Sequence, residues 1–262
     1  MRILKFSLTA SPTDRNLLFG GVAAGVASGV RVQHFGVNRG KTEMWLGLAE
    51  RQPGTGRAWL GQRNHWTRSD WRSAIEKQDT GAMLAAMHEV PVGPGDAWIV
   101  RTGLPHCLGG QALFLEVQEP TDFAVRCEYR RDGAELPESQ RWMGLDLDRA
   151  LECLQAEPIE VESCRLTPLP IDSGRHWKRE SLCGPGDCEC FEADIITIDG
   201  TAAFPATPPE ILIVLEGAAR IGEMKSRAFD RFAVLPEEDE FRVSGECRLL
   251  ACRAGSGADS PR

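Results

Sequence analysis

Three side chains in the first half of this 262-residue sequence are candidate metal ligands: His34, Glu43 and His106. His34 and Glu43 lie in two apolar-rich runs, VRVQHF and TEMWLGL, which are separated by the turn-like segment GVNRGK. The two runs are predicted to form a β-hairpin on which His34 and Glu43 face the same side. Two imidazoles and a carboxylate suit Zn²⁺ or another divalent first-row metal, with one coordination position open for a substrate.

Two polar residues stand next to these candidate ligands. Lys41 precedes Glu43 by two residues, and side chains two apart on a strand share a face. Lys41 is therefore a candidate for the same site, and the alternative is a solvated lysine in a turn. Gln33 directly precedes His34, so on a regular strand it points the other way. Gln33 can bind the metal only if a β-bulge redirects it; otherwise a water completes the site.

His106 ends a spaced pattern, G-x5-R-x-G-x2-H, that begins at Gly95 and includes Arg101 and Gly103. The pattern follows a Pro-Gly turn and contains the apolar run 97–100, which is typical of a strand. It resembles the second signature of the cupin superfamily, except that Arg101 stands where that signature has proline. The resemblance implies that a strand and a glycine turn present His106 inside a small β-barrel.

Four patches, taken in order, resemble class I mannose-6-phosphate isomerases, a family within the cupins. The patches are GKTEMW (40–45), LFLEVQE (113–119), DFAVRCEYRR (122–131) and GLDLDRALECL (144–154). The family's glutamine ligand lies two residues before its histidine, where this chain has Val32. The resemblance implies one divalent metal per chain, most commonly zinc. It also implies the site residues: metal ligands His34, Glu43 and His106, sugar contacts Lys41 and Glu116, and the catalytic arginine Arg126.

Bulk composition excludes several classes of partner. The formal net charge of −8 leaves no basic stripe, so nucleic acid is not an expected partner. No stretch reaches the roughly 20 apolar residues that a membrane helix needs, so no membrane partner is expected. Nine scattered cysteines favour reduced thiols in the cytoplasm. The alternative is a metal or redox site at Cys183, Cys188 and Cys190.

The elements that must position these residues are predicted to be mainly strands. Sixteen prolines, 27 glycines and short apolar runs favour strands and turns over a helical bundle. Thr67 and Asp70 resemble a capping box that opens a short helical insert at about 67–88. Strand-like runs return after Val161, with Glu238 and Phe241 where a metal-binding cupin has its glycine and histidine.

We therefore expect a mainly β chain with two cupin (jelly-roll β-barrel) domains. The expected domains are a catalytic metal-binding cupin at 1–135, a connecting helix at 136–158, and a second, metal-free cupin at 159–262.

The resemblance predicts a cytoplasmic, metal-dependent aldose–ketose isomerase. Such an enzyme interconverts mannose 6-phosphate and fructose 6-phosphate, both small-molecule phosphosugars, through an enediolate. Two alternatives stay open: another metal-dependent cupin enzyme, and a non-catalytic sugar-binding or regulatory cupin. The oligomeric state is not predicted.

Overall fold

The computed structural model describes residues 3–6, 31–32, 41–109, 111–119, 124–131, 133–206, 208–235 and 239–255. Over these residues strands far outnumber helices, so the predicted mainly β class is confirmed. The chain divides into two compact units: a first unit from residues 10–165, and a second unit from residues 1–9 and 166–262. Each helix in the described ranges is too short or too polar to cross a membrane.

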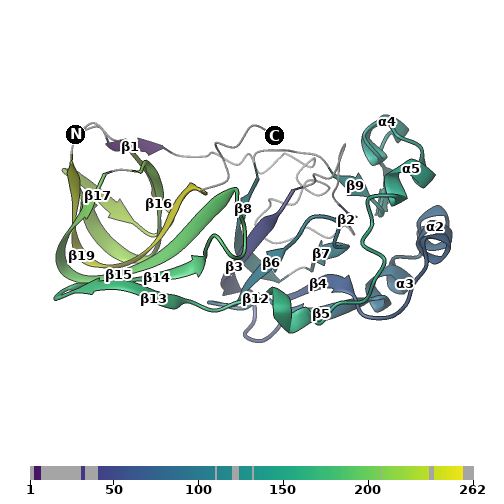
Figure 1. Ribbon diagram of the computed structural model, residues 1–262, viewed down its shortest axis with the longest axis horizontal. Coiled ribbons are helices and arrows are strands. Elements are labelled where there is room, and N and C mark those ends of the chain that lie inside the picture. Colours follow the sequence, from purple (N-terminus) through teal and green to yellow (C-terminus); the bar gives the residue numbers. More distant parts are fainter. Residues whose placement is uncertain are drawn as a thin grey trace. The chain divides into compact units, whose positions relative to one another are not determined.

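The first unit is built on two antiparallel sheets (Figure 1). The four-stranded sheet has the order β12 (Arg165–Leu166), β6 (Ala97–Val100), β3 (Glu43–Glu50), β8 (Ala112–Gln118). The five-stranded sheet has the order β5 (Met87–Pro91), β4 (Arg57–Gln62), β7 (His106–Leu108), β2 (Arg31–Val32), β9 (Val125–Arg126). A separate short hairpin joins β10 (Arg130–Arg131) to β11 (Ala134–Glu135).

The predicted hairpin between the runs that contain His34 and Glu43 is wrong for the residues that the structure describes. β3 pairs with β6 on one side and with β8 on the other, so both of its edges are occupied. β2 instead pairs with β7 and β9 in the five-stranded sheet. The two runs therefore enter different sheets, because strand partners far along the chain replace the local one.

Helices occupy the predicted insert between β4 and β5. α2 (Arg68–Lys77) begins with a capping box, in which Thr67 Oγ1 accepts from the Asp70 backbone N–H and Asp70 Oδ2 accepts from that of Thr67. Its buried residues Trp71, Ala74 and Ile75 follow the helical repeat and face the core. The other helical segments are α3 (Thr80–Ala85), α4 (Glu138–Arg141), α5 (Leu147–Leu151) and η1 (Val161–Cys164).

Among the described residues of the second unit, the strands form one strongly curved eight-stranded sheet (Figure 1). β15 (Phe191–Pro205) and β19 (Glu240–Ala254) pair antiparallel along their whole length. Phe241 is buried in the core, with its ring centroid 5.5 Å from that of Phe204. Glu238 lies outside the described residues. The other strands are β13 (Leu169–Gly174), β14 (Trp177–Cys183), β16 (Glu210–Ile221), β17 (Met224–Arg227) and β18 (Arg231–Val234).

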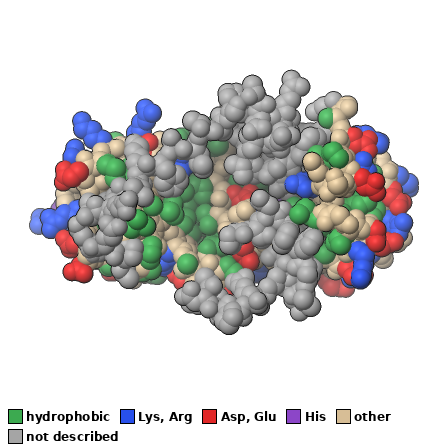
Figure 2. Space-filling view, turned by 90° about the horizontal axis from the view of Figure 1, so that it is seen from above, with side chains coloured by type: hydrophobic (Ala, Val, Ile, Leu, Met, Phe, Trp, Pro, Cys, Tyr) green, Lys and Arg blue, Asp and Glu red, His purple; other side chains and the backbone are tan. Residues whose placement is uncertain are grey.

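The first strand of the chain belongs to the second unit rather than to the predicted 1–135 domain. β1 (Ile3–Phe6) pairs antiparallel with β18, with Ile3 opposite Val234 and Phe6 opposite Arg231. The predicted division into domains otherwise stays a prediction. On the face drawn in Figure 2, acidic and basic side chains of the described residues lie intermixed.

Candidate metal and substrate site

The four-stranded sheet of the first unit presents a row of polar side chains on one face. Glu43 on β3 lies directly opposite Gln118 on β8, and Trp45 lies opposite Glu116. Residues directly opposite each other in an antiparallel pair share a face, as do residues two apart on one strand. Because side chains alternate between the two faces along β3 and β8, four of them project to the same side: Glu43, Trp45, Glu116 and Gln118.

Lys41 is buried in this row, with 4% of its surface exposed. Its Nζ lies 2.9 Å from Glu43 Oε1 and 3.5 Å from Glu116 Oε1, and it donates a hydrogen bond to Gln118 Oε1. The alternative of a solvated turn lysine is therefore wrong. The structure brings together Lys41, Glu43 and Glu116, and a buried ammonium with three oxygen partners is a held group rather than a mobile one.

His106 reaches the same place from the other sheet. It begins β7 and is 3% exposed, and its Nε2 lies 3.9 Å from Glu43 Oε1. Its Nδ1–H donates to the Leu104 carbonyl at 2.9 Å, so the lone pair is on Nε2, the atom nearer Glu43. The turn before β7 depends on Gly103, whose φ is +87° and where an added Cβ would lie 3.0 Å from the Cys153 carbonyl oxygen.

The Glu43–His106 pair fits a divalent metal ion. Zinc binds histidine nitrogen and carboxylate oxygen at about 2.0–2.2 Å, so one ion can contact two ligand atoms that are 3.9 Å apart. The Leu104 carbonyl fixes the tautomer that leaves the Nε2 lone pair able to bind a metal, and backbone carbonyls commonly hold metal-binding histidines in this way. Among the described side chains of this cluster, the carboxylates of Glu43 and Glu116 outnumber the single ammonium of Lys41. The local charge therefore favours a cation.

Arg126 and His106 stand on the same face of the five-stranded sheet. Both residues are paired with Arg31 of β2, which lies between β7 and β9. Their Cα atoms are thus separated by two inter-strand spacings, roughly 10 Å in total. Arg126 Nη1 donates to the Gln140 carbonyl at 2.8 Å. His34 and Gln33, predicted as a ligand and a possible ligand, lie outside the described residues.

Two residues of the row have contacts that the sequence patterns did not predict. Trp45 Nε1–H donates to Glu43 Oε2 at 2.9 Å, and Gln118 is a partner of Lys41. Both residues belong to the quoted patches GKTEMW and LFLEVQE. The signal that could have identified them is their spacing, because Trp45 is two residues from Glu43 and Gln118 is two residues from Glu116.

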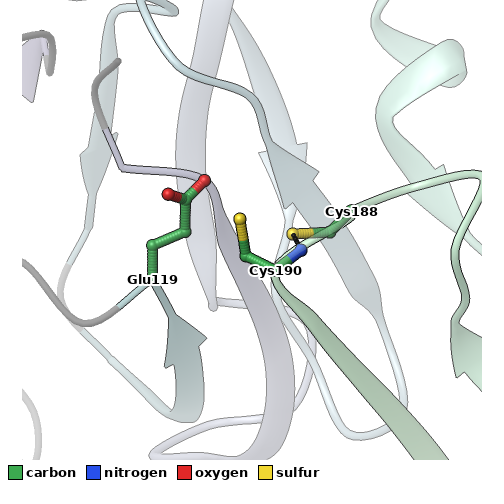
Figure 3. A group of neighbouring side chains, drawn as sticks. All are labelled: Glu119, Cys188 and Cys190. Atoms are coloured by element: carbon green, nitrogen blue, oxygen red, sulfur yellow. Dashed lines mark hydrogen bonds between the residues drawn. The ribbon is translucent and has the colours of Figure 1, made fainter. Parts of the chain in front are cut away.

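Of the three cysteines considered as an alternative metal or redox site, Cys183 is the last residue of β14. Cys188 and Cys190 are in the turn between β14 and β15, where the Cys190 backbone N–H donates to Cys188 Sγ at 3.4 Å (Figure 3). Their sulfur atoms lie within 4.8 Å of each other. Structural zinc sites use four ligands, so these two thiols do not make such a site by themselves. Glu119, also drawn in Figure 3, directly follows β8 of the first unit, and its side chain accepts from the Thr42 backbone N–H at 3.3 Å.

The described strands match a cupin-like fold. Solved structures with the same fold include mannose 6-phosphate isomerase from Bacillus subtilis, at a TM-score of 0.67 and 18% identity, covering 92% of this chain and 79% of that one. They also include a mannose 6-phosphate isomerase bound with zinc and yttrium, at a TM-score of 0.61 and 12% identity, covering 87% and 76%.

A variant of phosphomannose isomerase from Salmonella typhimurium is similar as well, at a TM-score of 0.58 and 13% identity, covering 84% of this chain and 67% of that one. At such identities the likeness shows the fold. No protein-family model and no curated protein sequence matches this chain.

Proposed function

We propose that this protein is a metal-dependent aldose–ketose isomerase that interconverts mannose 6-phosphate and fructose 6-phosphate. One observation carries the proposal: the buried Lys41 ammonium is held by Glu43 and Glu116 at the point where Glu43 faces His106. Two further facts support it. The motifs around these residues resemble those of the family, and mannose 6-phosphate isomerases, one of them zinc-bound, share the fold.

Glu43 and His106 would hold the metal together with His34, the predicted third ligand. When bound, a divalent metal ion supplies a Lewis acid that polarises the substrate oxygens. Glu43 contributes one carboxylate oxygen and His106 contributes Nε2, for the reasons of tautomer and spacing given above. Zinc is the metal that this mixed oxygen and nitrogen donor set suits well.

The remaining residues act on the open-chain sugar. In the direction from aldose to ketose, a base removes the C2 proton, the C–H electron pair forms the C1–C2 double bond, and the C1 carbonyl pair moves onto its oxygen to give the enediolate. A proton then moves from the C2 oxygen to the C1 oxygen, and a proton is added at C1 as the C2 carbonyl forms. Negative charge develops on the oxygens at C1 and C2. Lys41 and Glu116 contact the sugar in this proposal, and the guanidinium of Arg126 stabilises the developing charge.

The experiment combines metal analysis of the purified protein with a coupled assay for fructose 6-phosphate formed from mannose 6-phosphate. The wild type should contain metal and be active. His106→Ala should lose both properties, and Arg126→Ala should lose activity while it keeps the metal. Matched controls are His88→Ala, whose ring contacts the Ile159 carbonyl, and Arg149→Ala, an exposed arginine of α5. Both controls should keep metal and activity.

Other results would favour other functions. A metal-loaded wild type that leaves mannose 6-phosphate unchanged would favour another metal-dependent cupin enzyme. Folded protein with neither metal nor activity after metal is supplied would favour a non-catalytic sugar-binding or regulatory cupin.

A further inference from the structure

Trp45 touches both described metal-ligand candidates and is itself fully buried. Its Nε1–H donates to Glu43 Oε2 at 2.9 Å, and its ring lies edge-on to the His106 ring, with centroids 5.5 Å apart and planes at 67°. We propose that Trp45 is a positioning residue that orients the Glu43 carboxylate and the His106 imidazole for metal binding. This inference rests on the proposed metal-dependent function.

The hydrogen bond from Trp45 divides the two oxygens of the Glu43 carboxylate between two tasks. Oε2 accepts the indole N–H. Oε1 is the oxygen that lies 2.9 Å from Lys41 Nζ and 3.9 Å from His106 Nε2. A carboxylate held in this way keeps its plane fixed and one oxygen turned toward His106, because a partial rotation about its last side-chain bond would break the contact with the indole.

The ring of Trp45 restrains His106 from a second direction. The Leu104 carbonyl accepts from Nδ1 and sets the tautomer, while the indole packs against the imidazole and limits its tilt. An edge-to-face arrangement of this kind is a favoured geometry for aromatic pairs. Both ligand candidates therefore depend on one rigid, buried group, which is the arrangement that a preorganised metal site requires.

The protein contains a matched comparison for this tryptophan. Trp98 lies on β6 directly opposite Trp45, and it is 1% exposed. Its indole N–H donates to the Pro91 backbone carbonyl at 2.9 Å, so it makes a hydrogen bond of the same length to a partner outside the metal site. If Trp45 served only to fill the core, replacing either tryptophan by phenylalanine would have the same effect on metal binding.

The test measures zinc affinity by competition with a chelator for the wild type, Trp45→Phe and Trp98→Phe. Loss of a partner behind a metal ligand typically weakens binding 10–100-fold, so Trp45→Phe should bind zinc at least about 10-fold more weakly. Trp98→Phe should bind as the wild type does. The visible absorption of the cobalt(II)-loaded proteins should differ from wild type in Trp45→Phe alone, since that spectrum reports ligand geometry. Thermal melting of the metal-free variants shows how much of any change comes from stability.

Equal zinc affinities and equal cobalt spectra in the two variants would overturn the inference. If Trp45→Phe does not fold, 3-benzothienylalanine at position 45 keeps the bicyclic ring and removes only the N–H, and the same loss of affinity is expected. A wild type that binds no metal would contradict the proposed function and this inference together. A wild type that binds metal with unchanged affinity in Trp45→Phe would contradict only the inference.

Discussion

At the scale of single residues, the site is organised by a lysine that sits where an exposed residue would be expected. Lys41 is two residues from Glu43, and its ammonium is enclosed by oxygens of Glu43, Glu116 and Gln118. Burial of these charges is tolerated because each has partners of opposite sign or a hydrogen-bond donor close by. The lysine thus keeps two carboxylates close together, and in the proposed function it contacts the sugar.

Replacing this lysine should therefore damage both stability and activity. In Lys41→Met the carboxylates of Glu43 and Glu116 lose their shared cation. Removing one partner of a buried ion pair costs about 3–5 kcal/mol, so we expect a loss of about 3 kcal/mol in the metal-free protein. Urea unfolding measures this free energy, and the coupled assay should show loss of isomerase activity. Lys77→Met, at an exposed position in the last turn of α2, is the control and should change neither.

A second residue, Cys127, should make the free energy of unfolding depend on pH in the alkaline range. Cys127 is fully buried in the core of the first unit, and this burial raises the pKa of its thiol from 9.0 to about 12. Between these two pH values the unfolded chain releases the proton and the folded chain keeps it. The contribution of this thiol to the free energy of unfolding should therefore be constant below about pH 9 and fall as the pH rises toward 12.

Urea unfolding at a series of pH values tests this dependence, with Cys127→Ala as the comparison. The alanine variant should be less stable at neutral pH but should show a shallower loss at high pH. Identical pH slopes for the variant and the wild type would contradict the assignment.

The sequence predicted part of this residue-scale picture. The period of two along a strand correctly placed Lys41 and Glu43 together, and the resemblance added Glu116. The hydrogen bond from Trp45 to Glu43 was not predicted, because a tryptophan on a strand of this kind is usually explained by packing alone. The role of Gln118 depends on the register between β3 and β8, which no local pattern specifies.

At the scale of elements, the central strand β3 positions the site, and its close approach to a turn fixes it. Gly47 donates its N–H to the Asp96 carbonyl and accepts from the Gly95 N–H, at 2.8 and 2.9 Å. A Cβ at position 47 would lie 1.9 Å from the Gly93 carbonyl oxygen, which belongs to the backbone and cannot rotate away. Because it has no side chain, the glycine allows the backbone of β3 to contact the turn before β6 and to form both hydrogen bonds.

Gly47→Ala should force this turn away from β3 and disturb the strand that bears Glu43. We expect a destabilisation of about 3 kcal/mol, at the upper end of the usual cost of overpacking, together with weaker zinc binding. Gly186→Ala, where nothing lies within 4 Å of the added Cβ, is the control. Unchanged melting temperature and zinc affinity in Gly47→Ala would show that the turn is not coupled to the site.

Local elements were more predictable than strand pairing. The Thr67–Asp70 capping box and the apolar face of α2 follow from residues three or four apart, and both are present in the structure. The hairpin predicted for the His34 and Glu43 runs was wrong because both edges of β3 pair with other strands, β6 and β8. The pairing of β1 with β18 joins residues more than two hundred positions apart, and local residue patterns carry no signal for it.

At the scale of the whole molecule, the described metal-ligand candidates Glu43 and His106 belong to the first unit. A ligand that binds only the folded state stabilises it, by about 4 kcal/mol when its concentration is 1,000 times its Kd. Removing zinc with a chelator should therefore destabilise the first unit selectively. Hydrogen-exchange mass spectrometry should show lost protection in β3 and β7, while β15 and β19 of the second unit keep theirs. Equal losses of protection in both units would contradict a metal centre confined to the first unit.

The central claim is that the cluster around Lys41, Glu43 and His106 performs a metal-dependent isomerisation of a phosphosugar. The most direct test is proton NMR of mannose 6-phosphate incubated with zinc-loaded wild-type protein, and with the same protein after chelation. Fructose 6-phosphate should appear with the zinc-loaded protein, chelation should abolish its formation, and added zinc should restore it. Folded, zinc-loaded protein that leaves mannose 6-phosphate unchanged, or equal conversion after the metal is removed, would contradict the account.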